Sequence, residues 1–353
     1  MSLKKDEPDP KIAEWAAAME RLYDELVAAK RLIEGNESFI IAVHVRPDPD
    51  AVGSALALAR AIRHLGKRAV VISSDGVPDI CSYLPDADTV LTNTQERGFD
   101  VAVVCDAASL DRVGSAAEVL ASARSLFLID HHPQSTVAST NVEQTGFRET
   151  LSAIADWRSS TAEIVFQLLH QFRGMRLDAE MSRQLMAGIV GDTGAFRFAN
   201  TRRFTLAVAQ WLMEFGATIS EAAKEIYENR TLANTRLLGA ALLAAQVEED
   251  GKVVWSHITQ EDFARFEGSD KDTDGIVNQL TAMKGVQVGL LFREIEPNRI
   301  RVSLRSTGSV DVNRIARAFG GGGHAAAAGC TIEANLEKAE KAVLAEVRAW
   351  MES

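Results

Sequence analysis

The first half of the chain alternates short apolar runs with longer amphipathic stretches. The runs are typical of strands buried on both faces and lie at residues 39–44, 69–73, 101–105 and 125–129. Helical spacing appears around them, at residues 11–34, 51–65, 161–172 and 178–190. Gly66 is placed to end the second of these helices. This βαβ alternation predicts a parallel sheet with helices on both faces.

The pattern changes after residue 203. A long helical stretch follows, with these expected core contacts: Trp211, Leu212, Ile226, Leu237, Leu238 and Leu242. A second group of elements comes next, with strands at 253–258, 286–294 and 299–305 and helices at 312–319 and 335–350. We therefore predict an α/β protein with a large domain at 1–203, a helical connector at 204–244 and a smaller α/β domain at 245–353.

Composition narrows the class of protein. The 353 residues are 46% hydrophobic and 25% charged, which describes a globular chain. No segment approaches the roughly 20 apolar residues that cross a bilayer, and the first residues lack a secretory signal. Its three cysteines are far apart and fit a reducing compartment. We expect a cytoplasmic protein with no membrane partner. The net charge of −11 disfavours duplex DNA, whose binding needs a basic surface.

A dense group of polar residues follows the first predicted strand. His44, Asp48 and Asp50 lie within seven residues, and Gly53-Ser54 follows at the start of a helix. In open α/β sheets, ligands bind in the crevice where a strand ends and the next helix begins. Imidazole and carboxylate groups together suit divalent cations such as manganese. The alternative is a surface turn in which Asp50 caps the helix.

Two further strands end in residues of the same kind. Asp106 follows the strand at 101–105, and Asp130-His131-His132 follows the strand at 125–129. Because parallel strands end at one edge of the sheet, these side chains should converge with His44. Asp192 lies at the end of an apolar helix in Gly-Asp-Thr-Gly, where the alternative is a glycine cap beside a solvated carboxylate. The set favours two cations bridged by one carboxylate.

The smaller domain carries a basic strand and a glycine run. Arginines and a serine alternate with aliphatic residues along 299–306, so the polar side chains should share one face. The alternative is a solvated strand at the sheet edge. Four glycines, 320–323, precede His324; glycine lets backbone N–H groups approach a phosphate closely.

These motifs resemble those of the DHH phosphoesterase superfamily and occur in the same order. His44, Asp48, Asp50, Asp106, the Asp130-His131-His132 triplet and Asp192 resemble its four metal motifs, and residues 303–329 resemble its DHH-associated C-terminal domain. The likeness covers nearly the whole chain after residue 35. Among subgroups, the two-domain layout is most similar to bacterial nano-RNase and 3′-phosphoadenosine 5′-phosphate phosphatase proteins.

The resemblance implies a role for each matching position. One cation would take His44, Asp48 and Asp106, and the other Asp50, Asp106, His131 and Asp192, with Asp106 as the bridge. Asp130 would orient a histidine, and His132 would contact the scissile phosphate. The residues implied to bind substrate are Arg305, Ser306, Gly322, Gly323 and His324. The resemblance also implies an active site in the cleft between the domains and manganese, or else magnesium, as the cofactor.

The expected activity is hydrolysis of short single-stranded oligonucleotides and of nucleotide 3′-phosphates such as 3′-phosphoadenosine 5′-phosphate. Cyclic or linear di-adenylate phosphodiesterase activity is the alternative within the class. An inactive nucleotide-sensing protein is the alternative outside it. The N-terminal helix and the apolar connector are compatible with a homodimer, although no spacing requires one.

Overall fold

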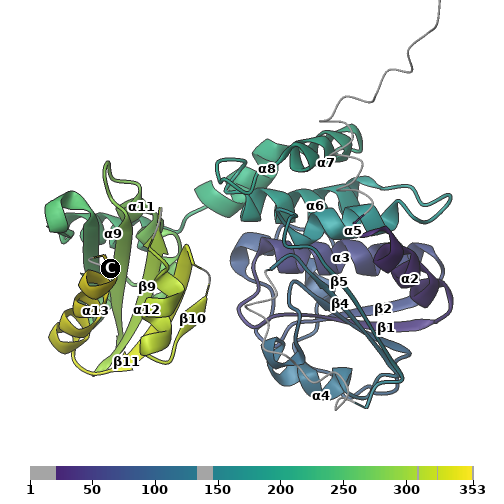
Figure 1. Ribbon diagram of the computed structural model, residues 1–353, viewed down its shortest axis with the longest axis horizontal. Coiled ribbons are helices and arrows are strands. Elements are labelled where there is room, and N and C mark those ends of the chain that lie inside the picture. The colour runs from purple at the N-terminus through teal and green to yellow at the C-terminus, as the bar shows by residue number, and fades with distance from the viewer. Residues whose placement is uncertain (1–20, 133–145, 308–309, 324, 352–353) are drawn as a thin grey trace, which may run out of the picture. The chain divides into compact units, whose positions relative to one another are not determined.

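The computed structural model describes residues 21–132, 146–307, 310–323 and 325–351 (Figure 1). The chain forms two compact units that divide between Asn229 and Arg230. This division falls inside the predicted connector at 204–244, whose limits remain a prediction. No helix in the described ranges combines the length and the apolar character needed to cross a membrane.

Unit 1 is built on a five-stranded parallel sheet in the order β2-β1-β3-β4-β5. Its strands are β1 (Ser38–Val43), β2 (Arg68–Ile72), β3 (Val101–Cys105), β4 (Ser125–Asp130) and β5 (Glu149–Ile154). Four of them match the predicted apolar runs. The sequence did not predict β5, because this strand at the end of the sheet alternates polar and apolar residues and is only partly buried.

Helices cover both faces of this sheet, as predicted. They are α2 (Tyr23–Glu34), α3 (Pro49–His64), α4 (Ala117–Leu120), α5 (Thr161–Leu169), α6 (Ala179–Asp192), α7 (Arg203–Glu214) and α8 (Ile219–Ala223). The main core packs α3, α5 and α6 on the face that includes Ile41 and Val43. A smaller core places α4 and short 3-10 turns on the opposite face, over Ile40 and Ala42. Figure 1 shows α4 across the sheet from α3. The predicted helix at 11–34 is described only from residue 21.

Unit 2 contains a six-stranded mixed sheet in the order β10-β11-β9-β8-β7-β6, in which only β7 and β8 pair in parallel. Its strands are β6 (Gln246–Glu248), β7 (Val253–Ile258), β8 (Val288–Glu296), β9 (Arg299–Ser306), β10 (Gly322–Gly323) and β11 (Ala327–Glu333). Its helices are α9 (Leu232–Leu243), α10 (Gln260–Arg265), α11 (Ile276–Thr281), α12 (Val312–Ala318) and α13 (Leu336–Met351). Separate apolar clusters cover the two faces of the sheet.

The helical stretch after residue 203 forms as predicted, but its burial differs in part. Leu212 and Leu237 are fully buried, whereas Trp211 is 54% exposed and Leu242 39% exposed. A π-helical turn, Lys224–Glu228, separates α8 from α9. The expectation that Trp211 and Leu242 are core contacts was wrong, because each helix packs on one side only and these residues lie outside that side.

Candidate metal centre

The predicted ligands come together where the strands of unit 1 end. His44 directly follows β1, Asp106 directly follows β3, and Asp130 is the last residue of β4. Because β3 lies between β1 and β4, these three ends are neighbours at one edge of the sheet. Asp192, the last residue of α6, reaches the same place through its contact with His131.

Side-chain atoms at this edge lie within metal-binding distance of one another. His44 Nε2 is 3.3 Å from Asp106 Oδ2 and 4.0 Å from Asp48 Oδ2. His131 Nε2 is 2.9 Å from Asp192 Oδ2, 3.5 Å from Asp106 Oδ1 and 3.9 Å from Asp50 Oδ2. Three groups have ligand atoms mutually within 4.8 Å: His44 with Asp48 and Asp106, Asp50 with His131 and Asp192, and Asp106 with His131 and His132.

The loop after β1 is shaped by its own short-range contacts. Asp48 is the N-cap of α3, and its Oδ1 accepts hydrogen bonds from the amides of Asp50 and Ala51, each at 3.0 Å. Pro49 occupies the first helical position, which needs no N–H donor. The alternative prediction of a surface turn in which Asp50 caps this helix was wrong, since Asp48 is the cap and Asp50 is fully buried.

Asp50 and Asp106 share contacts with the start of α5. Both oxygens of Asp50 accept backbone hydrogen bonds, from Thr161 at 2.6 Å and from Ala162 at 2.9 Å. The hydroxyl of Thr161 donates to Asp106 Oδ1 at 2.9 Å. Asp106 itself has a φ of 62°, an uncommon value that often marks functional positions. Sequence reasoning missed Thr161, although Ser-Ser-Thr before an apolar helix is a recognisable N-terminal signal.

Glycines let the helices approach the carboxylates closely. A Cβ on Gly53 would lie 2.2 Å from the backbone oxygen of Gln184, so α3 and α6 cannot pack this way with a side chain there. A Cβ on Gly188 would lie 2.5 Å from Asp50 Oδ1. Close packing of the helices therefore requires glycine at positions 53 and 188.

Asp130 orients His132 and not its neighbour His131. Asp130 Oδ1 lies 2.6 Å from His132 Nδ1 and also accepts from the His132 amide at 3.1 Å. His44 is oriented in a similar way, because its Nδ1 donates to the carbonyl oxygen of Val45 at 2.9 Å. In both rings a hydrogen bond at Nδ1 fixes the orientation and the tautomer.

The electrostatics of the cluster favour added positive charge. Burial and the charges of Asp106 and Asp192 raise the pKa of Asp48 to about 6, and the same causes raise the pKa of Asp50 well above its usual range. Burial alone would lower the pKa of His44, but Asp106, Asp48 and the Val45 carbonyl together outweigh it and raise the pKa to about 9. Among the described residues, no Lys or Arg pairs with the carboxylates of this cluster.

The cluster therefore fits divalent cations. Asp106 Oδ2 and His131 Nε2 are buried, and within the described ranges neither makes a contact with hydrogen-bond geometry. Buried polar atoms whose hydrogen-bonding capacity is not met carry a large desolvation cost unless a ligand satisfies them. Four carboxylates with imidazoles form the mixed donor set that suits manganese, and the carboxylate oxygens also suit magnesium.

The predicted substrate-binding residues lie in unit 2. Arg305 and Ser306 end β9, and Gly322 and Gly323 form β10, with β11 between these strands. Strand β9 has the predicted alternation of buried aliphatic and partly exposed polar residues. The alternative of an edge strand was wrong, because β9 is internal to the sheet. His324 lies outside the described residues.

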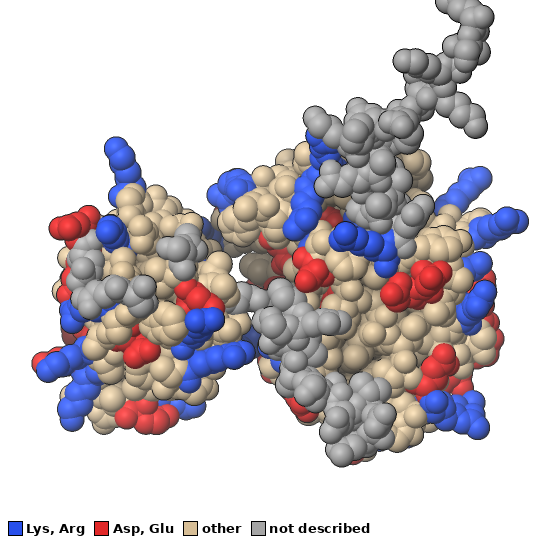
Figure 2. All heavy atoms as spheres, in the orientation of Figure 1, with Lys and Arg blue, Asp and Glu red and all other residues tan. Residues whose placement is uncertain are grey.

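Arg305 is held in place by its neighbours. Its Nε donates to Asn278 Oδ1 at 3.0 Å, and one terminal nitrogen donates to the carbonyl of Leu304 at 3.0 Å. Burial and the nearby Arg293 lower the pKa of Arg305. On the face of the described residues drawn in Figure 2, basic and acidic side chains are interspersed.

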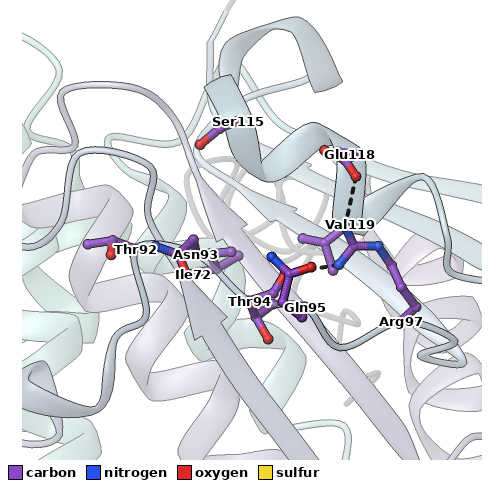
Figure 3. A pocket seen from close by; sticks show the side chains of 9 residues that line it. All are labelled: Ile72, Thr92, Asn93, Thr94, Gln95, Arg97, Ser115, Glu118 and Val119. Carbon is purple, nitrogen blue, oxygen red and sulfur yellow. Dashed lines mark hydrogen bonds and ion pairs between the residues drawn. The ribbon is translucent and has the colours of Figure 1, made fainter.

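A pocket of about 170 Å³ in unit 1 contains none of the predicted site residues (Figure 3). It is lined by Ile72, Thr92, Asn93, Thr94, Gln95, Arg97, Ser115, Glu118 and Val119. Its one cation, Arg97, is 2.8 Å from Glu118, so the two charges are already paired. The clustered carboxylates, and not this pocket, define the candidate site.

The comparisons with sequence families agree with this fold. Residues 38–189 match the model of the DHH family, N-terminal domain, and residues 244–353 match that of the DHHA1 domain. The chain therefore belongs to the DHH family of phosphoesterases. It is 32% identical over 93% of its length to the bifunctional oligoribonuclease and PAP phosphatase NrnA of Thermus thermophilus, 93% of which is covered. A protein of the same name from Bacillus subtilis is 30% identical over 86% of this chain and 91% of that protein.

Solved structures share the fold of this chain. An exopolyphosphatase-related protein from Bacteroides fragilis superposes with a TM-score of 0.84 at 26% identity, over 93% of this chain and 96% of that one. RecJ of Thermus thermophilus in complex with Mn²⁺ has a TM-score of 0.55 at 15% identity, over 92% of this chain and 54% of that one. The second likeness concerns the fold alone.

Proposed function

We propose that this protein is a two-metal phosphoesterase that hydrolyses short oligoribonucleotides and nucleotide 3′-phosphates such as 3′-phosphoadenosine 5′-phosphate. The main support for the proposal is a set of candidate ligand groups in unit 1. One group contains Asp106, another contains His131, and these two residues also belong to one further group. The relatives named as oligoribonuclease and PAP phosphatase, which align over most of the chain, support the substrate class.

We assign one cation to His44, Asp48 and Asp106, and the other to Asp50, Asp106, His131 and Asp192. A pair of divalent cations supplies a nucleophile at neutral pH and neutralises charge on the phosphate. Manganese is the proposed cation, with magnesium as the alternative. Asp106 contributes to both sets because its Oδ2 lies near His44 and its Oδ1 near His131.

The remaining residues serve the substrate. His132, oriented by Asp130, contacts the scissile phosphate and assists departure of the leaving oxygen. Arg305, Ser306, Gly322, Gly323 and His324 bind a terminal phosphate or the nucleotide. In this proposal residues 1–203 carry the catalytic groups, residues 204–244 connect the domains and residues 245–353 select the substrate. The proposal includes a cytoplasmic location and no action on duplex DNA.

A second candidate is cyclic or linear di-adenylate phosphodiesterase activity. The chain is 24% identical over 92% of its length to cyclic-di-AMP phosphodiesterase PdeA of Listeria monocytogenes, and the match covers 49% of that protein. This likeness spans only half of the relative and is weaker, so we place the activity second.

One activity panel with manganese tests these proposals. The substrates are 3′-phosphoadenosine 5′-phosphate, oligoribonucleotides of graded length, cyclic and linear di-adenylate, and pyrophosphate. We expect turnover of the first compound and of the shortest oligonucleotides. Preference for di-adenylates would favour the second candidate. Binding of a labelled dinucleotide with no turnover of any substrate would indicate a sensor.

The Asp106→Ala variant tests the metal assignment. It removes a ligand from both groups, so we expect kcat/KM to fall at least about 1,000-fold, which corresponds to roughly 4 kcal/mol of transition-state stabilisation. Bound manganese should fall in parallel while circular dichroism stays unchanged. Asp88→Ala, which removes an exposed carboxylate from a 3-10 turn, is the matched control. Near-normal turnover by Asp106→Ala would refute the assignment.

A further inference from the structure

Thr161 contacts two carboxylates that we assign to different cation sets. It is the first residue of α5, and its side chain is fully buried. Its hydroxyl donates to Asp106 Oδ1 at 2.9 Å, and its backbone amide donates to Asp50 Oδ2 at 2.6 Å. One residue therefore fixes two acids that are far apart in the sequence.

The hydroxyl has a distinct role at Asp106. The imidazoles of His44, His131 and His132 also lie near this carboxylate, at 3.3, 3.5 and 3.7 Å. Within the described part of the chain, Thr161 is the one hydrogen-bond donor to Asp106 that is not itself a candidate ligand or phosphate contact. A neutral donor can hold the carboxylate plane without competing for a cation.

The backbone contact at Asp50 is reinforced by the helix. Thr161 and Ala162 present two N–H groups of the first turn of α5, which the helix itself cannot satisfy. The positive end of the helix dipole also favours an ionised carboxylate there. Ser54 Oγ adds a weaker contact to Asp50 Oδ1 at 3.3 Å.

The start of α5 is also linked to Asp192, another acid of the second cation set. The Asn200 side-chain amide donates to the carbonyl of Ser159 at 3.2 Å and to that of Asp192 at 3.0 Å. The Ser159 hydroxyl also donates to Glu163 within the buried first turn of the helix. The segment that carries Thr161 is thus fixed relative to Asp192 as well.

We propose that Thr161 is a positioning residue for both cations: its hydroxyl orients the bridging carboxylate Asp106 while its amide holds Asp50. The inference rests on the two-cation site proposed above and goes beyond it by assigning a residue that binds neither cation. Without the hydroxyl, the plane of the Asp106 carboxylate is no longer fixed. Because the hydroxyl contacts Oδ1, the oxygen near His131, binding of the second cation should weaken more than binding of the first.

The experiment compares metal binding by Thr161→Val, Thr161→Ala and Thr161→Ser with that of the wild-type chain. Isothermal titration with Mn²⁺ gives the number and affinity of bound ions, and electron paramagnetic resonance reports the coupled pair. Loss of a partner behind a metal ligand typically weakens metal binding about 10- to 100-fold. For Thr161→Val and Thr161→Ala we expect this loss of affinity for one of the two ions, the second cation of the proposal, together with a reduced coupled signal. Thr161→Ser keeps the hydroxyl and should show wild-type ion affinity and a wild-type coupled signal.

Thr205→Val is the matched control. Thr205 is equally buried in unit 1, but its hydroxyl accepts from the backbone amide of Arg202 at the start of α7. This variant should bind two ions as the wild-type chain does. If Thr161→Val and Thr161→Ala both bind two ions with wild-type affinity and coupling, the inference is overturned and the proposed function is not. A wild-type chain that binds no pair of ions would overturn the proposed function, and the inference with it.

Discussion

Two adjacent histidines in the candidate site have different surroundings. His131 Nε2 lies within 3.9 Å of three carboxylates, Asp50, Asp106 and Asp192. His132 Nδ1 lies 2.6 Å from Asp130, which comes from the end of the same strand. We therefore interpret His131 as a metal ligand and His132 as a group held for contact with substrate. The pair is directly adjacent in sequence, so only the surroundings separate these roles.

Asp130→Asn tests this division at the residue scale. The amide keeps the shape but loses the charge that holds the His132 ring, so we expect kcat to fall about 10- to 100-fold. Manganese stoichiometry should remain that of the wild-type chain. In a His132→Ala background the same substitution should have almost no further effect, because its partner is already absent. Equal losses in both backgrounds would show that Asp130 acts through another group.

At the scale of elements, the site depends on how closely α3, α5 and α6 pack. Gly188 in α6 lies where a Cβ would come within 2.5 Å of Asp50 Oδ1 and 2.8 Å of the Ala162 Cβ. The absence of a side chain therefore permits both the contact between helices and the position of a candidate ligand. The stability of the fold and the geometry of the site are linked at this residue.

Gly188→Ala should damage both properties. Overpacking of this kind typically costs about 1–3 kcal/mol, and the displaced Asp50 should bind its cation more weakly. Urea unfolding and manganese titration measure the two effects. Gly239→Ala is the matched control, because Gly239 lies in α9 and a Cβ added there would have no other atom within 4 Å. It should keep metal binding and gain up to about 1 kcal/mol from helix propensity. Wild-type manganese affinity in Gly188→Ala would contradict the steric argument.

At the scale of the whole molecule, the candidate metal ligands and the proposed substrate-binding residues lie in different units. The candidate ligands between His44 and Asp192 all belong to unit 1, whereas Arg305, Ser306 and the glycine run belong to unit 2. Each unit has its own apolar clusters on the two faces of its sheet. We therefore expect metal binding and substrate affinity to respond to different substitutions.

Arg305→Ala tests this separation. Loss of hydrogen bonds to a charged group costs about 1.5–3 kcal/mol, so we expect KM for short substrates to rise roughly 10- to 100-fold. Manganese stoichiometry should not change. Arg299→Ala is a control on the same strand, where Arg299 lies 3.2 Å from Glu296 and 3.4 Å from Glu333 at a partly exposed position. An unchanged KM across all substrate lengths for Arg305→Ala would remove this residue from the proposed binding site.

The sequence determined most elements and the identity of the clustered side chains. Short, continuous apolar runs such as Val101–Cys105 are typical of buried strands, and the C-terminal ends of neighbouring parallel strands bring Asp106 and His131 to one edge of the sheet. The alternation of polar and aliphatic residues also predicted that the arginines of β9 share one face of the strand. Burial of the amphipathic helices was predicted less well, since Trp211 and Leu242 are exposed.

Only the tertiary structure decided the contacts between segments that are distant in the chain. It brought Thr161 to Asp50, 111 positions away, and to Asp106, 55 positions away. It also assigned Asp130 to His132, made Asp48 the helix cap in place of Asp50, and gave β5 a place in the sheet. Periodicity and motif spacing describe neighbours along the chain, whereas a hydrogen bond across the core depends on how whole elements pack.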